Sequence, residues 1–151
     1  MFVFLLPILM SSIVDVKKKV KEFNINWIQL HFTDIIGRLR VLHLPVSSFF
    51  ENVIDNGIGF DGSSVGFAKI EKSDMIVKPD IDSFLVLPHE QGEARFIGEI
   101  YDSSGKPFIA DTRNILKKAI VFAKNQGFDK VMFSPELEFY LVKEHGQEEP
   151  K

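Results

Sequence analysis

Apolar and polar residues alternate with a different period in successive parts of the chain. Residues 13–23 repeat their apolar positions at helical spacing with lysines between them, which predicts a short amphipathic helix. Residues 25–32 and 39–45 follow a two-residue period instead, and the turn between them contains Gly37, so the pattern predicts two strands joined as a hairpin. A second helix is expected over residues 46–56.

The second half of the pattern predicts further strands and a longer helix. Three strand candidates lie at 75–80, 83–88 and 94–102, and proline and glycine separate them. Residues 112–126 carry an apolar face at helical spacing, and Asp111 stands before them as a suitable N-cap. The chain therefore alternates between sheet-forming and helix-forming segments.

The last predicted strand, residues 131–142, contains two carboxylates in an otherwise apolar run, FSPELEFYLV. In a strand Glu136 and Glu138 would point to the same face, roughly 6.6 Å apart along the chain. Burial of two like charges is costly unless something positive or water meets them. Two interpretations remain open. Either this is a solvated edge strand with each glutamate paired to a lysine, or it is part of a divalent-metal site that needs further ligands.

The loop FDGSS, residues 60–64, presents a similar choice. Asp-Gly followed by two serines is a common surface turn. Exposed loops on a rigid sheet also carry binding residues, and a carboxylate such as Asp61 can hold a cation or accept a proton. The four histidines follow no metal-binding spacing, and we interpret His31 and His43 as hydrogen-bonded structural residues.

Together these elements predict an α+β fold in two parts. Residues 10–103 combine a mixed sheet with a helix across it, the arrangement called β-grasp. Residues 104–151 hold one helix and one strand, which cannot close a core of their own, so we interpret them as the incomplete start of a second domain. Residues 1–9 are too short to span a bilayer, which takes about 20 apolar residues, and we leave them out of the fold as a leader.

Composition narrows the function only by exclusion. The 151 residues are 45% hydrophobic and 26% charged, which is typical of a globular protein. The net charge of −3, without a long run of one sign, favours neither nucleic acid nor an anionic membrane as a partner. The chain has no cysteine, which excludes a disulfide scaffold and thiolate metal sites and agrees with a cytoplasmic protein.

An ordered series of segments resembles the N-terminal third of a type I glutamine synthetase. The series runs from about Val14 to Val142 and includes FDGSS, EKSDMIVKPD, DTRNILKKA and SPELEFYLV in the order of that family. The resemblance implies a β-grasp domain followed by the first metal-ligand strand of the catalytic domain. It also implies an ATP-dependent glutamate–ammonia ligase that works through γ-glutamyl phosphate.

The resemblance also implies roles for particular residues. Glu136 and Glu138 match the first two carboxylate ligands of a paired Mg²⁺ or Mn²⁺ site, one at the nucleotide phosphates and one at the glutamate side. Asp61 matches the aspartate that binds ammonium and helps to deprotonate it, with Ser64 beside it. In the family the N-terminal domain of one subunit completes the active site of its neighbour, so Asp61 and the two glutamates would serve different sites.

Three hypotheses follow for the chain as a whole. It is the N-terminal part of a glutamine synthetase whose activity needs the missing catalytic residues, and which assembles with its own copies or with full-length subunits. Alternatively, it is a catalytically silent short relative that binds a full-length synthetase or another protein, or a β-grasp binding module unrelated to glutamine. On the first hypothesis we expect the 151-residue chain alone to be inactive and to bind divalent metal weakly.

Overall fold

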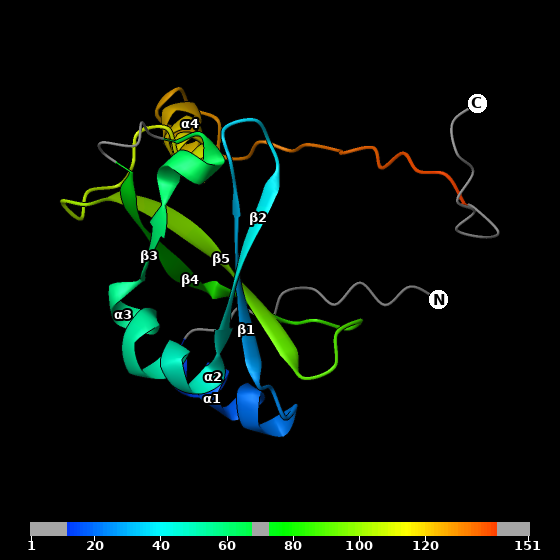
Figure 1. Ribbon diagram of the computed structural model, residues 1–151. Helices are drawn as coiled ribbons and strands as arrows, with labels where there is room; N and C mark the ends of the chain where they lie inside the picture. The colour runs from blue at the N-terminus through cyan, green and yellow to red at the C-terminus, as the bar shows by residue number, and fades with distance from the viewer. Residues whose placement is uncertain (1–11, 68–72, 142–151) are drawn as a thin grey trace, which may run out of the picture.

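The computed structural model describes residues 12–67 and 73–141, and these residues form a mixed five-stranded sheet with helices against it (Figure 1). The strand order is β2-β1-β5-β4-β3. The leader predicted at residues 1–9 lies outside the described residues. The elements in chain order are α1 (Ile13–Glu22), β1 (Trp27–Thr33), β2 (Leu39–Pro45), α2 (Val46–Ser48), a π-helical turn (Phe49–Val53), α3 (Ile54–Asn56), β3 (Ile58–Asp61), a 3-10 turn (Gly62–Val65), β4 (Asp74–Val86), β5 (Glu93–Asp102) and α4 (Thr112–Asn125).

The predicted hairpin is confirmed, and it forms one side of the sheet. β1 pairs antiparallel with β2, with Thr33 opposite Leu39, and it pairs parallel with β5. Asp34 closes the turn, because its carboxylate accepts hydrogen bonds from the backbone N–H groups of Ile36 and Arg38 and from the Arg40 guanidinium. Gly37 takes a positive φ of 85° in this turn, a conformation that costs glycine little.

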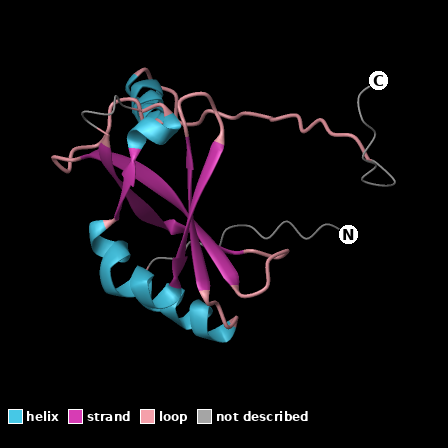
Figure 2. Cartoon of the chain, in the orientation of Figure 1, coloured by secondary structure: helices cyan, strands magenta, loops and turns pink. Residues whose placement is uncertain are grey.

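One face of the sheet forms the hydrophobic core, and the first helices cover it. Phe96 on β5 is fully buried and stacks on Phe49 of the π-helical turn, with 4.9 Å between the ring centroids. α1 contributes Val16 and Val20, whose burial agrees with the predicted amphipathic pattern. Gly98 has no room for a side chain, because an added Cβ would lie 2.2 Å from the Val77 side chain. Figure 2 shows α1 to α3 gathered as one helical layer at the lower end of the sheet.

The predicted second helix matches the structure, while the strands β3 and β4 differ from the prediction. The helix predicted over 46–56 forms as one helical run, although its middle turn is π-helical. The two strands predicted at 75–80 and 83–88 are a single strand, β4, with an irregular register between Asp80 and Leu85. The strand β3 was not predicted, because its glycine-rich sequence shows no clear alternation of apolar and polar residues.

Beyond residue 103 the chain stays against the sheet before it departs. Phe108 packs against the core, and its N–H donates to the Ile100 carbonyl. Asp111 is buried and caps α4 as predicted, by accepting hydrogen bonds from the N–H groups of Arg113 and Asn114. None of the helices in the described residues is long and apolar enough to cross a membrane.

The expectation of a strand over residues 131–142 is corrected by the structure. Residues 130–141 have no regular structure, and Val142 lies outside the described residues. The segment runs away from the body of the molecule (Figure 1). A strand is held by hydrogen bonds to a neighbouring strand, and a run with β-forming sequence but without a neighbour stays irregular.

Candidate functional site at the end of strand β3

Asp61 lies where the edge strand β3 ends and the 3-10 turn begins. It is the N-cap of that turn, and the backbone continues through Gly62 close under Met75 of β4. An added Cβ on Gly62 would lie 2.6 Å from the Met75 sulfur and 3.2 Å from the Ser73 main-chain oxygen, so a larger residue here would force the Met75 side chain to shift. The turn therefore fixes Asp61 at an exposed corner of a rigid sheet.

Two serines hold Asp61 in different ways. The Ser63 hydroxyl and backbone N–H both donate to Asp61 Oδ1, at 2.7 Å and 2.9 Å. The Ser64 hydroxyl donates to the main-chain carbonyl of Asp61 at 2.7 Å, so it braces the backbone and not the carboxylate. The structure thus brings Asp61 and Ser64 together, as the sequence predicted for neighbours in one loop. It adds Ser63, whose role sequence reasoning missed although its position two residues after an aspartate is typical of an Asx-turn.

The hydrogen bonds set the charge of this carboxylate. Donation from the Ser63 hydroxyl and then from the Ser63 N–H lowers the pKa of Asp61 below its ordinary value, with a smaller contribution from Ser73. Asp61 is therefore ionised at neutral pH. A fixed, exposed carboxylate of this kind is suited to binding a small cation, and its lowered pKa makes it a weak base.

The core supports the loop from below. Phe67, the last described residue after the turn, is buried, and its ring lies 5.6 Å from Phe108 and 6.3 Å from Phe32. Gly66 takes a positive φ of 77° and lets the chain turn back toward this cluster. The aromatic contacts anchor the end of the loop, while Asp61 itself remains exposed.

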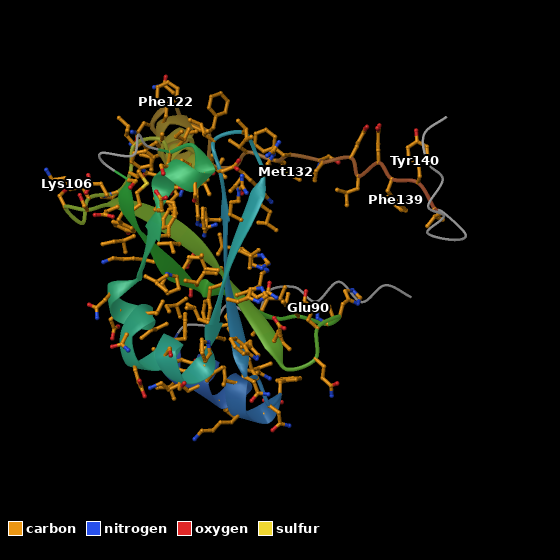
Figure 3. All side chains as sticks on the ribbon, viewed as in Figure 1. Glu90, Lys106, Phe122, Met132, Phe139 and Tyr140 are labelled. Atoms are coloured by element: carbon orange, nitrogen blue, oxygen red, sulfur yellow. The ribbon has the colours of Figure 1, made fainter. Side chains whose placement is uncertain are left out.

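Glu136 and Glu138 lie elsewhere, on the irregular segment 130–141, and both are exposed. Figure 3 shows Met132, Phe139 and Tyr140 of this segment extending away from the sheet. The structure does not bring the two glutamates next to Asp61. Among the described residues no group of three or more histidines, aspartates or glutamates could hold a metal ion. Two exposed carboxylates fit the chemistry of Mg²⁺ but not the number of ligands that a tight site requires.

His31 of the hairpin is hydrogen-bonded to a neighbouring side chain of the sheet. His31 Nε2 lies 2.6 Å from the Gln29 side-chain oxygen, and the Gln29 amide donates to Glu90 and Glu93 at 2.7 Å each. Burial, followed by the charges of Arg95 and His43, lowers the pKa of His31. His31 is therefore hydrogen-bonded within the sheet, which agrees with its interpretation as a structural residue.

The strand order and the helices across one sheet face define a β-grasp domain, with Asp61 exposed at one sheet edge. A family model described as the β-grasp domain of glutamine synthetase matches residues 24–103. The chain belongs to the glutamine synthetase family, and the matched part is the N-terminal domain of that family.

Similar proteins agree with this assignment and cover most of the chain. Glutamine synthetases of Staphylococcus aureus strain MW2 and of Staphylococcus epidermidis are each 39% identical over 140 residues, which is 90% of this chain and 31% of each relative. The chain therefore spans about a third of the length of these relatives.

Two solved structures resemble the fold. A GmaS protein in complex with ADP has a TM-score of 0.68 at 23% identity and matches 78% of this chain and 26% of that one. A Plasmodium falciparum glutamine synthetase has a TM-score of 0.67 at 24% identity and matches 78% of this chain and 23% of that one. At these identities the likeness shows the fold alone.

Proposed function

We propose that the chain is the N-terminal part of an ATP-dependent glutamate–ammonia ligase in which Asp61 binds ammonium. The observation that carries this proposal is the carboxylate of Asp61, which is ionised, exposed and oriented by Ser63 at the end of a rigid edge strand. The 39% identity to glutamine synthetases over 140 residues supports the reaction class. Glutamate, ammonium and ATP are the substrates on this proposal.

The lowered pKa of Asp61 favours cation binding over proton removal as its main task. An anion of lowered pKa attracts ammonium but takes a proton from it reluctantly, because a strong base needs a higher pKa. Ser64 has a supporting role, since its hydroxyl holds the Asp61 main chain, while Ser63 orients the carboxylate. Binding ammonium next to an acyl phosphate would raise its local concentration there. The bound ammonium must still lose a proton to a base before the resulting ammonia can attack the acyl carbon and displace phosphate.

The metal part of the proposal is limited to two residues. Glu136 and Glu138 are the candidate carboxylate ligands for Mg²⁺ or Mn²⁺, which would neutralise charge on the phosphoryl group in transfer. Alone they do not make a tight site, so we derive no catalytic step through a metal.

Assembly and location complete the proposal. Because Asp61 ends β3 and the two glutamates lie on the irregular segment 130–141, we propose a homo-oligomer in which Asp61 faces the catalytic residues of a neighbouring subunit. A cytoplasmic location agrees with the lack of cysteine. No observation on the described residues favours the alternative of a catalytically silent binding partner.

A chimera tests the proposal. The matching segment of the Staphylococcus aureus enzyme is replaced by this chain, and ammonium-dependent phosphate release from ATP is measured together with the elution volume of the assembly. We expect an active oligomer in which Asp61→Asn raises the KM for ammonium about tenfold or more, while the KM for glutamate changes little.

The matched control for this experiment is Asp82→Asn, which removes another exposed carboxylate on the same sheet and should leave both KM values unchanged. An assembled but inactive chimera would contradict the proposal, and so would a chimera that does not assemble. An unchanged KM for ammonium in Asp61→Asn would remove Asp61 from the site.

A further inference from the structure

Helix α4 contacts the sheet through its charged side chains, while its apolar residues face outward. The exposed apolar residues of the helix are Ile115, Leu116, Ile120, Val121 and Phe122. The contacts with the sheet come from Thr112, Arg113 and Lys117. This is the reverse of the usual arrangement, in which a helix buries its apolar stripe against its neighbour.

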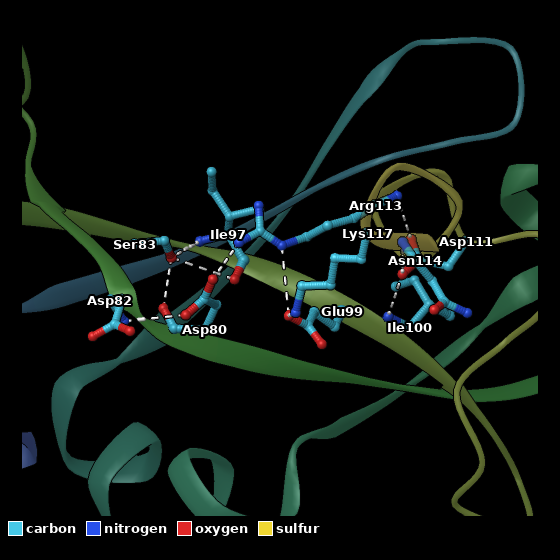
Figure 4. Close-up of polar contacts among 10 residues, drawn as sticks. All are labelled: Asp80, Asp82, Ser83, Ile97, Glu99, Ile100, Asp111, Arg113, Asn114 and Lys117. Atoms are coloured by element: carbon cyan, nitrogen blue, oxygen red, sulfur yellow. Dashed lines mark hydrogen bonds and ion pairs between the residues drawn. The ribbon is translucent and has the colours of Figure 1, made fainter. Parts of the chain in front are cut away.

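Arg113 lies at the centre of these contacts (Figure 4). Its Nη2 donates to Asp80 Oδ2 on β4, and its Nε lies 3.6 Å from Glu99 Oε1 on β5. Lys117, one helical turn later, pairs with the same Glu99 oxygen. Glu99 alternates with the buried Ile100 along β5, so these contacts lie on the sheet face opposite the core.

Asp80 is the last residue of β4 before its pairing with β5 becomes irregular. The register shifts between Asp80 and Leu85, and Ser83 bridges the irregularity. The Ser83 hydroxyl donates to the Asp80 carbonyl at 2.6 Å and accepts from the Ile97 N–H at 2.6 Å. Asp80 itself is still in register with Ile97, so regular alternation along β4 puts its side chain on the same sheet face as Glu99.

The N-terminus of α4 is hydrogen-bonded to the sheet, whereas the polar contacts further along the helix are only partly satisfied. Asp111 is 1% exposed and accepts from the Ile100 N–H, which ties the N-terminus of α4 to β5. Along the helix, the buried Arg113 Nε has no hydrogen-bond partner. Burial, together with the like charge of Arg113, lowers the pKa of the neighbouring Arg95. Two cations are therefore crowded where the helix meets the sheet.

We propose that Arg113, Lys117, Asp80 and Glu99 form an ionic clamp that holds α4 on the sheet as a unit that opens separately from it and stays attached through Asp111. Partly exposed ion pairs are screened by salt and each contributes little, so the clamp opens without unfolding the sheet. Because a helix of this length is marginal on its own in water, α4 unravels when the clamp opens. The clamp would thereby set the direction in which residues 130–141 leave the sheet.

Amide hydrogen exchange on the full chain tests the clamp, with one set of amides in α4 and a second in β1 and β5. We expect Arg113→Met to speed exchange across α4 about tenfold or more and to leave the amides of β1 and β5 unchanged. Glu99→Gln should act in the same direction, because it removes the partner shared by Arg113 and Lys117. In the unaltered chain, raising the salt concentration to about 1 M should speed α4 selectively.

Lys118→Met is the matched control, because Lys118 is exposed on the same helix and makes no ion pair among the described residues. Its exchange pattern should equal that of the unaltered chain. The clamp is refuted if α4 exchanges at the same rate with and without Arg113. It is also refuted if α4 and the sheet lose protection together, because they would then be one cooperative unit.

Discussion

The sheet with its first helices and the segment that follows it use the same kinds of residues in opposite ways. In the body, up to β5, Phe96 is 0% exposed and packs against Phe49 and Phe84. In α4, Phe122 is 67% exposed, and Tyr140 further along is 96% exposed. The body is held by buried apolar surface, whereas α4 is held by ion pairs, by the Thr112 hydrogen bond to β1 and by the Asp111 cap.

This difference shows that the apolar pattern of a helix predicts which of its faces is suited to burial. The pattern does not predict which part of the molecule covers that face. α1 and α4 have similar amphipathic sequences and both begin at a capping side chain. α1 packs on the sheet core through Val16 and Val20, whereas the outward apolar residues of α4 stay 44% to 67% exposed. The sheet and its first helices therefore leave the apolar face of α4 uncovered.

The largest effect that separates the two regions is expected from truncating an aromatic side chain in each. Phe96→Ala should lower the free energy of unfolding by about 3–5 kcal/mol, because it removes buried contacts and leaves a cavity between Phe49 and Phe84. Phe122→Ala should change it by no more than about 0.5 kcal/mol, because the ring is mostly in water. Urea denaturation followed by Trp27 fluorescence gives both values.

Equal losses in the two variants would show that α4 is part of the same core. A small loss at Phe96 would mean that the body can close the cavity, in which case its packing is looser than the buried rings indicate.

Much of the fold was predictable because its signals are local. The hairpin, the first helix and the α4 helix with its Asp111 cap follow directly from apolar spacing and turn residues. The continuous β4 strand was not predicted, because Pro79 and the polar residues after it read as a break. Pairing with β5 and the Ser83 hydrogen bonds carry the strand through that irregularity.

The candidate site was predictable only in part. The FDGSS loop drew attention to Asp61, but the local pattern could not tell which serine contacts the carboxylate, since Ser63 and Ser64 are neighbours. The relation between Asp61 and the two glutamates depends on parts that lie far apart in sequence. The segment 131–141 has a strand-like sequence, yet a strand is formed by its partner as much as by its own residues.

A smaller effect is expected in the body, where the free energy of unfolding should depend on pH through the carboxyl group of Asp34. Burial alone would raise the pKa of Asp34, but the Arg38 N–H, the Arg40 guanidinium and the Ile36 N–H together hold the pKa below its ordinary value. The stability that ionised Asp34 contributes is therefore complete above the ordinary value of 3.8 and is lost as the pH falls through the lowered value.

Asp34→Asn should accordingly be less stable than the unaltered chain at pH 7, and the two should converge as the pH is lowered below 3.8. The exposed Asp55→Asn is the control and should follow the unaltered chain throughout. Denaturation curves across this pH range decide the matter. A gap between the two proteins that stays constant down to low pH would show that the Asn change acts through packing and not through charge.

Substitutions in the segment 130–141 should have the smallest effect on the free energy of unfolding. They should nevertheless change how strongly the chain associates with its own copies. Phe133 and Phe139 are exposed on a chain that has no regular structure, and an apolar run with unpaired backbone groups is prone to associate with other copies. Phe133→Ser with Phe139→Ser should leave the free energy of unfolding within about 0.5 kcal/mol, because neither ring touches the core. The same double change should shift the protein toward monomer in light scattering at tens of micromolar.

The double variant Glu136→Gln with Glu138→Gln should instead increase association, since it removes the like charges that oppose stacking of this segment on itself. If the unaltered chain is already a monodisperse monomer, the exposed apolar residues do not drive association, and this segment must be covered in solution by the body of the same molecule.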